Sequence, residues 1–296
     1  MIARRLLGGL VLFAAGMAAS VLLLLAAACG APEQPPIALV TPSPNPSATP
    51  TFTTSSLTST HPSAATPTVI PPTATPVVMV CSPLDGVPLE ELDERVVNPY
   101  APPPLGSDDP HQGVDLAQLL PGSDIAVEGL PVHTALAGRV AGVVRDRFPY
   151  GNALLVETPL DSLPAAWGAW EALPASGATP QGRNSLTCPP AEPQALGIGT
   201  GRSLYLLYAH LQEAPAFQPG DPLECGQVVG RIGGSGNALN PHLHLEGRVG
   251  PAGAVFTGLA HYETRAAPVE MGNYCLWRVS GSYLPLDPLW LLGGLR

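Results

Sequence analysis

Two histidines two residues apart are the first candidates for chemistry in this chain. His242 and His244 lie in the segment Pro-His-Leu-His-Leu-Glu (241–246), which follows the turn-rich residues 233–237. The alternation of polar and apolar residues predicts a β-strand. Residues two apart in a strand point to the same face, so the two imidazoles are expected about 7 Å apart on one face. One of them can bind a metal ion while the other lies just behind it, although such a pair alone is more often two ordinary polar side chains.

A second candidate lies upstream, in the segment His-Gln-Gly-Val-Asp (111–115). His111 and Asp115 are four residues apart, and Gly113 between them lets the backbone turn, so both side chains can converge on one ion. Imidazole and carboxylate are the usual non-thiolate ligands of catalytic zinc, which keeps three protein ligands and an open position for water. The alternative interpretation is a surface loop with a helix-capping aspartate.

A third histidine ends an apolar segment. Residues 204–211 read Leu-Tyr-Leu-Leu-Tyr-Ala-His-Leu and predict a buried strand with His210 at its mouth. A polar ring in such a place is most often structural. The three motifs are weak singly, but their joint occurrence in the order HxGxD, YxHL and HxH is rare in a protein that does not use them. His61 lies in the proline-rich stretch near the N-terminus and is set aside, while His133 and His261 have no matching motif and are expected to be surface or partly buried residues.

In this ordered set of motifs the chain resembles the lysostaphin and LytM type of zinc endopeptidase, which cleaves peptidoglycan and is built on a small antiparallel β fold. The resemblance covers about residues 110–291. It also includes shorter matches at residues 131–132, 137–140, 150–152, 226–230, 234–236 and 287–289.

The resemblance implies a role for each of five residues. His111, Asp115 and His244 are expected to bind Zn²⁺, and His210 and His242 to flank the bound water. One of the latter two would act as the base and the other would stabilise the tetrahedral oxyanion, in an order that the sequence leaves open. The implied reaction is metal-assisted hydrolysis of a peptide bond, in which a neutral histidine takes the proton of the attacking water.

The expected fold is mainly β, a small antiparallel β-sheet or sandwich-like metallopeptidase domain with long loops. Strands are predicted at about residues 132–146, 153–157, 204–210, 227–232 and 242–247. Glycine-rich and proline-rich connections between them leave little room for helices.

Two departures from the family pattern stand out. Residues 158–202 form an insertion where the family has a short turn, and they carry Trp167, Trp170 and Cys188. Such a long loop can line the substrate groove, lie across it, or decorate the surface, and a disulfide can pin it. Leu245 replaces the aromatic residue usual after the HxH motif, a packing change expected to leave the ligands unaffected.

The N-terminal residues indicate export. Arg4 and Arg5 precede an uncharged run at 6–28, which is the order of an export signal. The ending Leu-Ala-Ala-Ala-Cys resembles a bacterial lipoprotein box with Cys29 as the lipidated residue, although the leucine lies four positions before the cysteine instead of three. The alternative is an uncleaved membrane anchor, since a spanning helix needs about twenty residues. Both interpretations place the rest of the chain outside the cytoplasm, attached to the cell membrane.

The chain is then predicted to have three parts: a leader at 1–29, a tether at 30–80 and the metallopeptidase domain at 81–296. The tether is rich in Pro, Ser, Thr and Ala and cannot bury enough apolar surface to offset its ordering entropy, so it is expected to be disordered. The formal net charge of −10, with 13 basic residues, argues against binding to nucleic acid.

Four cysteines remain if Cys29 carries lipid. An even number in an exported chain predicts two disulfides. Among the three pairings, Cys81 with Cys275 and Cys188 with Cys225 is favoured.

Three functions remain open at this stage. The leading one is an active wall endopeptidase that acts on peptidoglycan peptides during cell-wall remodelling or cell separation. The second is a catalytically silent module that binds the wall or activates another wall hydrolase. The third is a zinc peptidase that cleaves another protein. The presence of all five candidate residues favours activity.

Overall fold

The structure is a computed structural model, and it describes residues 78–101, 103–104, 106–164, 186–189 and 201–293. These residues all belong to one compact unit of the chain, Ile70–Arg296. The predictions for the leader, for Cys29, for most of the tether and for the two tryptophans of the insertion lie outside the described residues. None of the helices in the described ranges is both long enough and apolar enough to cross a membrane.

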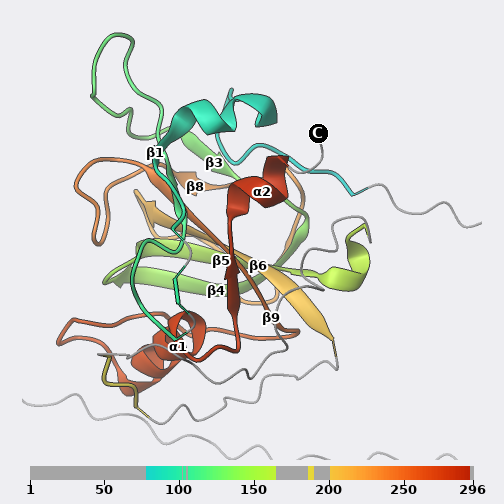
Figure 1. Ribbon diagram of the computed structural model, residues 1–296, viewed down its shortest axis with the longest axis vertical. Helices are drawn as coiled ribbons and strands as arrows, with labels where there is room; N and C mark the ends of the chain where they lie inside the picture. The colour runs from blue at the N-terminus through green and yellow to red at the C-terminus, as the bar shows by residue number, and fades with distance from the viewer. Residues whose placement is uncertain (1–77, 102, 105, 165–185, 190–200, 294–296) are drawn as a thin grey trace, which may run out of the picture. The chain divides into compact units, whose positions relative to one another are not determined.

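An eight-stranded sheet forms the body of this unit (Figure 1). Its strand order is β1-β2-β9-β6-β5-β4-β7, and β10 also pairs with β9. Every pairing between these strands is antiparallel. The strands are β1 Val96–Asn98, β2 Val114–Leu116, β4 Gly138–Arg147, β5 Gly151–Pro159, β6 Arg202–Leu211, β7 Pro222–Leu223, β9 Leu243–Pro251 and β10 Leu284–Leu286. A second, two-stranded sheet pairs β3 Pro131–His133 with β8 Val228–Arg231. The predicted fold class, mainly antiparallel β, is confirmed.

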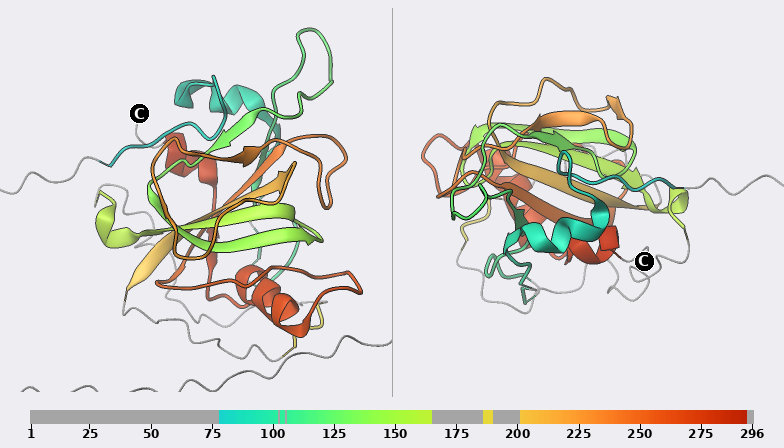
Figure 2. Two further views of the ribbon diagram at one scale, coloured as in Figure 1. Left: turned by 180° about the vertical axis from the view of Figure 1, so that it is seen from behind. Right: turned by 90° about the horizontal axis from the view of Figure 1, so that it is seen from above.

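The described helices are few and lie on two sides of the large sheet. They are the 3-10 helices η1 Leu89–Arg95 and η2 Leu160–Ser162 and the α-helices α1 Pro268–Arg278 and α2 Pro288–Gly293. Figures 1 and 2 show α1 on one side of the sheet and η1 and α2 on the other. Helix α1 begins with Pro268, whose fixed φ suits the first turn, and the Glu270 side chain accepts a hydrogen bond from the Ala267 amide at 2.8 Å.

Strand β6 is buried on both faces, which explains why its sequence is almost continuously apolar. Alternate residues enter two different clusters, Leu204, Leu206 and Tyr208 in one and Tyr205, Leu207 and Ala209 in the other. The first cluster includes residues of η1 and α2, and the second includes residues of α1. Burying each large apolar side chain contributes about 1.5–3 kcal/mol, so β6 is a fixed support for His210 near its end.

The strand predicted at 132–146 is instead two strands in different sheets, β3 and β4. The backbone leaves the strand path between them, where the Thr134 amide donates to the Gln227 carbonyl at 2.9 Å and the Ala135 amide donates to the Tyr208 hydroxyl at 2.8 Å. The short strands β2, β7 and β10 have too few alternating residues to be predicted from periodicity.

Two disulfides are present, as expected, but the favoured pairing was wrong. The bonds join Cys81 to Cys225 and Cys188 to Cys275. The Cys81 amide donates to the carbonyl of Ala135, next to Thr134, whose carbonyl accepts from the Gly226 amide, so the first pair meets across one segment. Such a meeting depends on sheet order, which cysteine spacing does not reveal. The second bond pins the insertion to α1.

Candidate metal centre

Strand register brings the candidate residues together. Asp115 on β2 lies directly opposite His244 on β9, and His244 lies opposite Ala209 on β6, one residue before His210. Gly113 is needed for space: a Cβ atom there would lie 2.7 Å from Cε1 of His244. The interpretation of Gly113 as a turn residue therefore gives way to close packing against the His244 ring.

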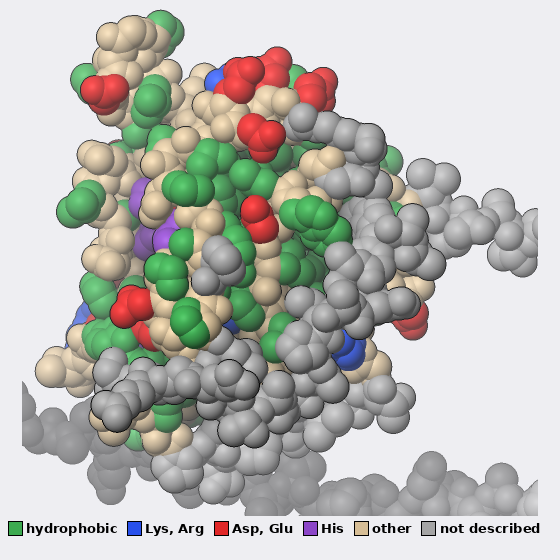
Figure 3. All heavy atoms as spheres, viewed as in Figure 1, with side chains coloured by type: hydrophobic (Ala, Val, Ile, Leu, Met, Phe, Trp, Pro, Cys, Tyr) green, Lys and Arg blue, Asp and Glu red, His purple; other side chains and the backbone are tan. Residues whose placement is uncertain are grey.

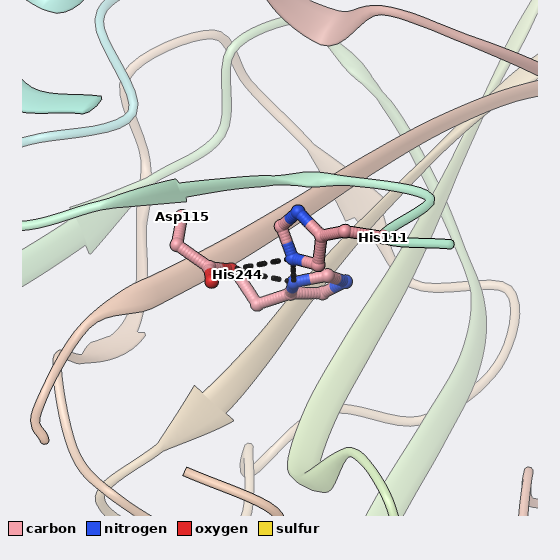
Figure 4. A group of neighbouring side chains, drawn as sticks. All are labelled: His111, Asp115 and His244. Carbon is pink, nitrogen blue, oxygen red and sulfur yellow. Dashed lines mark hydrogen bonds and ion pairs between the residues drawn. The ribbon is translucent and has the colours of Figure 1, made fainter. Parts of the chain in front are cut away.

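Three side chains meet at one point (Figure 4). Asp115 Oδ1 lies 2.7 Å from His244 Nδ1 and 3.1 Å from His111 Nε2, and the two nitrogens are 3.1 Å apart. Donor atoms about 2.1 Å from a common tetrahedral ion lie about 3.4 Å from one another. The observed triangle is slightly smaller than this, so the three donors suit a zinc ion after small side-chain movements.

The outer atoms of these three side chains are already engaged. His111 Nδ1 lies 3.0 Å from the carbonyl oxygen of Pro99, and His244 Nε2 lies 3.1 Å from Glu246 Oε1. Because these oxygens only accept, the outer nitrogens carry protons, and the inner nitrogens, which face Asp115, can bind a metal ion once they give up any proton that they hold. Asn98 donates to Asp115 Oδ2 at 3.0 Å, which leaves Oδ1 facing the two rings.

His210 and His242 lie beside the triangle, with their ring centroids 4.8 Å apart. Each ring places Nδ1 against a backbone carbonyl, that of Ser235 at 2.7 Å for His210 and that of Asn240 at 2.8 Å for His242. Nε2 is therefore the nitrogen of each ring that no backbone carbonyl holds, and in His242 it lies 3.4 Å from Asp115 Oδ1. His210 has a φ of 61°, a left-handed conformation that is costly for a residue with a side chain and is held here by the end of β6.

Burial and charge set the protonation of this group. Burial lowers the pKa of His210 to about 3, and electrostatic repulsion from the neighbouring His244 and His242 rings lowers it further. Burial alone would also lower the pKa of His244, but hydrogen bonds with Asp115 and Glu246 raise it to about 9. Burial opposes ionisation of Asp115, yet its hydrogen bonds with His111, His242 and His244 hold its pKa far below the ordinary value. At neutral pH His210 is thus a neutral ring in the metal-free protein.

Glu246 lies behind His244, one of the three candidate metal ligands, and was assigned no role from the sequence. It is fully buried, and burial disfavours its charge, but Arg278 and Arg248 hold its pKa well below the ordinary value. Its carboxylate accepts hydrogen bonds from Tyr150, Trp277, Arg248 and Arg278. The alternation that placed His242 and His244 on one strand face extends to Glu246 two residues on, and this signal could have identified it.

A cavity of about 700 Å³ opens over all five candidate residues. It is also lined by β1, by the loop after β2 and by the segment before β9, including the exposed side chains of Leu119 and Leu239. Figure 3 shows histidine side chains reaching the surface together among apolar and uncharged groups. The five candidate residues therefore line a cavity that is open to solvent.

The two remaining histidines in the described part of the chain, His133 and His261, are not part of the site. His133 is partly buried and lies 2.8 Å from the Gly226 carbonyl oxygen, and His261 is buried with Nε2 3.1 Å from the carbonyl oxygen of Thr187. Leu245 is buried in the cluster on the opposite face of β9 from His244, so it does not touch the donor atoms.

No protein-family model matches this chain, and neither does any curated protein sequence. Among solved structures, the catalytic domain of the antimicrobial peptidase lysostaphin from Staphylococcus simulans is similar, with 17% identity, coverage of 70% of this chain and 98% of that one, and a TM-score of 0.36. A mutant catalytic domain of the prophage-encoded M23 protein EnpA from Enterococcus faecalis has 18% identity, coverage of 53% and 81%, and a TM-score of 0.30. A zinc-containing peptidase from Vibrio cholerae has 21% identity over 51% of this chain and 32% of its own, with a TM-score of 0.29. At such identities and TM-scores, the function has to be inferred from the site itself.

Proposed function

We propose that this chain is a zinc-dependent endopeptidase that hydrolyses peptide cross-links or stem peptides of bacterial peptidoglycan, in cell-wall remodelling or cell separation. The observation that carries the proposal is the triangle of His111 Nε2, Asp115 Oδ1 and His244 Nδ1, with no side longer than 3.1 Å. Three protein donors beneath an open cavity match a catalytic zinc site, which keeps a position for water, and differ from a closed structural site with four protein ligands.

The residues around the triangle support hydrolysis. When bound there, zinc supplies Lewis acidity toward a substrate carbonyl and makes water a better nucleophile. The His210 ring is neutral at neutral pH and lies 5.6 Å from the His244 ring, and because Ser235 holds its Nδ1, its Nε2 is the atom that would take a proton from the attacking water. His242 also presents its Nε2 on the side of Asp115, and once protonated either ring can donate to the oxyanion or to the leaving amine.

The cell wall is proposed as the substrate because of the N-terminal part of the sequence. A leader ending at Cys29 and a Pro/Ser/Thr-rich tether at 30–80 would hold the domain at the outer face of the membrane, within reach of wall peptides. Lipid attachment at Cys29 and the three-part division of the chain stay predictions.

The test is zinc content and release of free amines from purified peptidoglycan by the full-length chain. One zinc per chain and new amines are expected, and His244→Ala should abolish both. His133→Ala is the matched control, because His133 is partly buried but lies outside the site, and it should retain both. Absence of zinc would overturn the enzyme and leave a wall-binding or activator module. Zinc with cleavage of folded proteins but not of wall would leave the peptidase and replace its substrate.

A further inference from the structure

Helix α1 contributes one side chain, Arg278, that contacts both segments that carry the metal donors. We infer that Arg278 is a positioning residue for the metal centre, joining the carboxylate behind His244 to the segment that carries His111. This inference rests on the proposed metal centre and goes beyond it, since Arg278 belongs to none of the motifs that identified the site.

The first half of the link leads to β9. Arg278 Nη1 donates to Glu246 Oε1 at 2.7 Å, and the same oxygen lies 3.1 Å from His244 Nε2. The neighbouring Trp277 donates from Nε1 to Glu246 Oε2 at 2.7 Å, so α1 holds both oxygens of the carboxylate. A carboxylate fixed in this way fixes the rotation of the histidine ring that it contacts, and such supporting groups usually affect metal affinity 10- to 100-fold, by order of magnitude.

The second half of the link leads to the segment before β2. Arg278 Nε donates to Asp108 Oδ1 at 2.7 Å, and Nη2 donates to the Asp108 backbone carbonyl at 2.7 Å. Asp108 also accepts from the hydroxyl of Tyr274, on α1, at 3.1 Å and from that of Tyr262 at 2.6 Å. Asp108 lies three residues before His111, so these bonds fix the chain just before the first candidate ligand.

The same segment is held a second time by β9. Gln112 donates to the Ser107 carbonyl at 2.8 Å, and its own oxygen accepts from Arg248, which in turn donates from Nε to Glu246 at 3.2 Å. Two arginines from different elements therefore converge on one buried carboxylate and on one short segment. Arg278 differs from Arg248 because it comes from outside the sheet.

An arginine suits this position better than any other cation. Arg278 has only 11% of its side chain exposed and lies between two carboxylates, so its charge offsets the cost of burying them. Its planar fork offers donors in three directions, to Glu246 and to both the side chain and the backbone of Asp108, whereas a lysine ammonium cannot span these groups at once.

The test is the zinc affinity of the full-length chain with Arg278→Lys, measured by competition with a chelator, together with the visible spectrum of the Co²⁺-loaded protein and the thermal midpoint of the metal-free protein. We expect zinc affinity to be about 10- to 100-fold weaker and the Co²⁺ spectrum to be altered. The thermal midpoint of the metal-free variant should stay high enough for the protein to be folded under the assay conditions, so that unfolding does not explain the weaker zinc binding. Arg265→Lys is the matched control, because Arg265 is an exposed arginine paired with Asp146 and Glu263. Arg265→Lys should change neither the zinc affinity nor the Co²⁺ spectrum.

A second variant, Asp108→Asn, removes the charge at the other end of the link and should weaken zinc binding in the same way. In the double variant the two losses should be less than additive, because both substitutions break one link. Wild-type affinity and spectrum in Arg278→Lys would overturn the inference, as would additive losses. Absence of zinc from the wild-type chain would instead overturn the proposed metal centre, so the two failures are distinguishable.

Discussion

Asp115 and His244 face each other across β2 and β9, with Oδ1 and Nδ1 2.7 Å apart. Backbone pairing, and not a flexible loop, thus sets the distance between two of the three proposed ligands. Antiparallel pairing holds such side chains within about 5.5 Å at Cα, which is the range that a shared ion requires.

Any side chain at position 113 should displace the His244 ring, because there is no space there for a Cβ atom. In Gly113→Ala the new methyl group would meet the His244 ring and the Leu245 carbonyl, both at 2.7 Å. We expect a loss of about 1–3 kcal/mol in the free energy of unfolding and weaker zinc binding, measured by denaturant unfolding and chelator competition. Gly201→Ala is the control, because nothing lies within 4 Å of its Cβ position. Unchanged zinc affinity in Gly113→Ala would show that the His244 ring can move freely.

Substitution of His210 or His242, which are not among the three proposed ligands, should lower catalytic activity without loss of zinc. His210→Ala and His242→Ala leave the three donors in place, so each should retain zinc, while turnover of wall peptides falls about 10²- to 10⁴-fold. Steady-state rates and zinc content would be measured on the same preparations. Loss of zinc in either variant would place that histidine among the ligands.

The metal-free protein should lose stability in acid through His210. Its folded-state pKa is about 3, below the unfolded value of about 6.5. Above pH of about 6.5 both states hold the ring neutral, so its contribution to stability is fully present. As the pH falls toward 3, the unfolded chain binds a proton that the folded chain does not, and the contribution is lost.

His244 acts in the opposite direction, since its pKa of about 9 makes it stabilising below about pH 6.5 and removes that stabilisation as the pH rises through 9. The comparison that isolates His210 is therefore wild type against His210→Asn. Denaturant unfolding from about pH 4 to pH 8 should show wild type losing stability relative to the variant as the pH falls. A constant difference across this range would contradict the prediction.

The two disulfides should differ in their effect on the metal centre. The Cys188–Cys275 bond holds the helix that carries Arg278, whereas the Cys81–Cys225 bond lies beside β3 and β8. Replacing either pair by serine should cost about 2–5 kcal/mol of stability. Only the first replacement should also weaken zinc binding, as measured by chelator competition on folded protein. Equal zinc affinities in the two double variants would contradict the prediction.

The sequence contained much of the fold and of the site because both depend on local patterns. Apolar runs located β5 and β6, alternation of polar and apolar residues located β9, and the short motifs identified five polar side chains that the structure brings together. Their roles as ligands and bases stay predictions. The disulfide pairing and the break between β3 and β4 could not be read in this way, because they depend on which strands become neighbours.

The contribution of α1 was likewise beyond the reach of sequence patterns. Arg278 lies 170 residues after Asp108 along the chain, and no motif joins them. The position of Glu246 on the same strand face could have been predicted, because it continues the alternation of His242 and His244. Its role depends on partners from α1, which periodicity within β9 does not show.

Hydrogen bonds to the outer nitrogens of His111, His210, His242 and His244 should affect the entropy of metal binding. Each ring is already held by a hydrogen bond to Pro99, Ser235, Asn240 or Glu246. The rotational entropy of the rings is therefore lost when the chain folds, and little of it remains to be lost when an ion arrives. Binding of a metal ion should therefore be fast and require little rearrangement of the rings. Selectivity among ions should then depend on their size and preferred geometry.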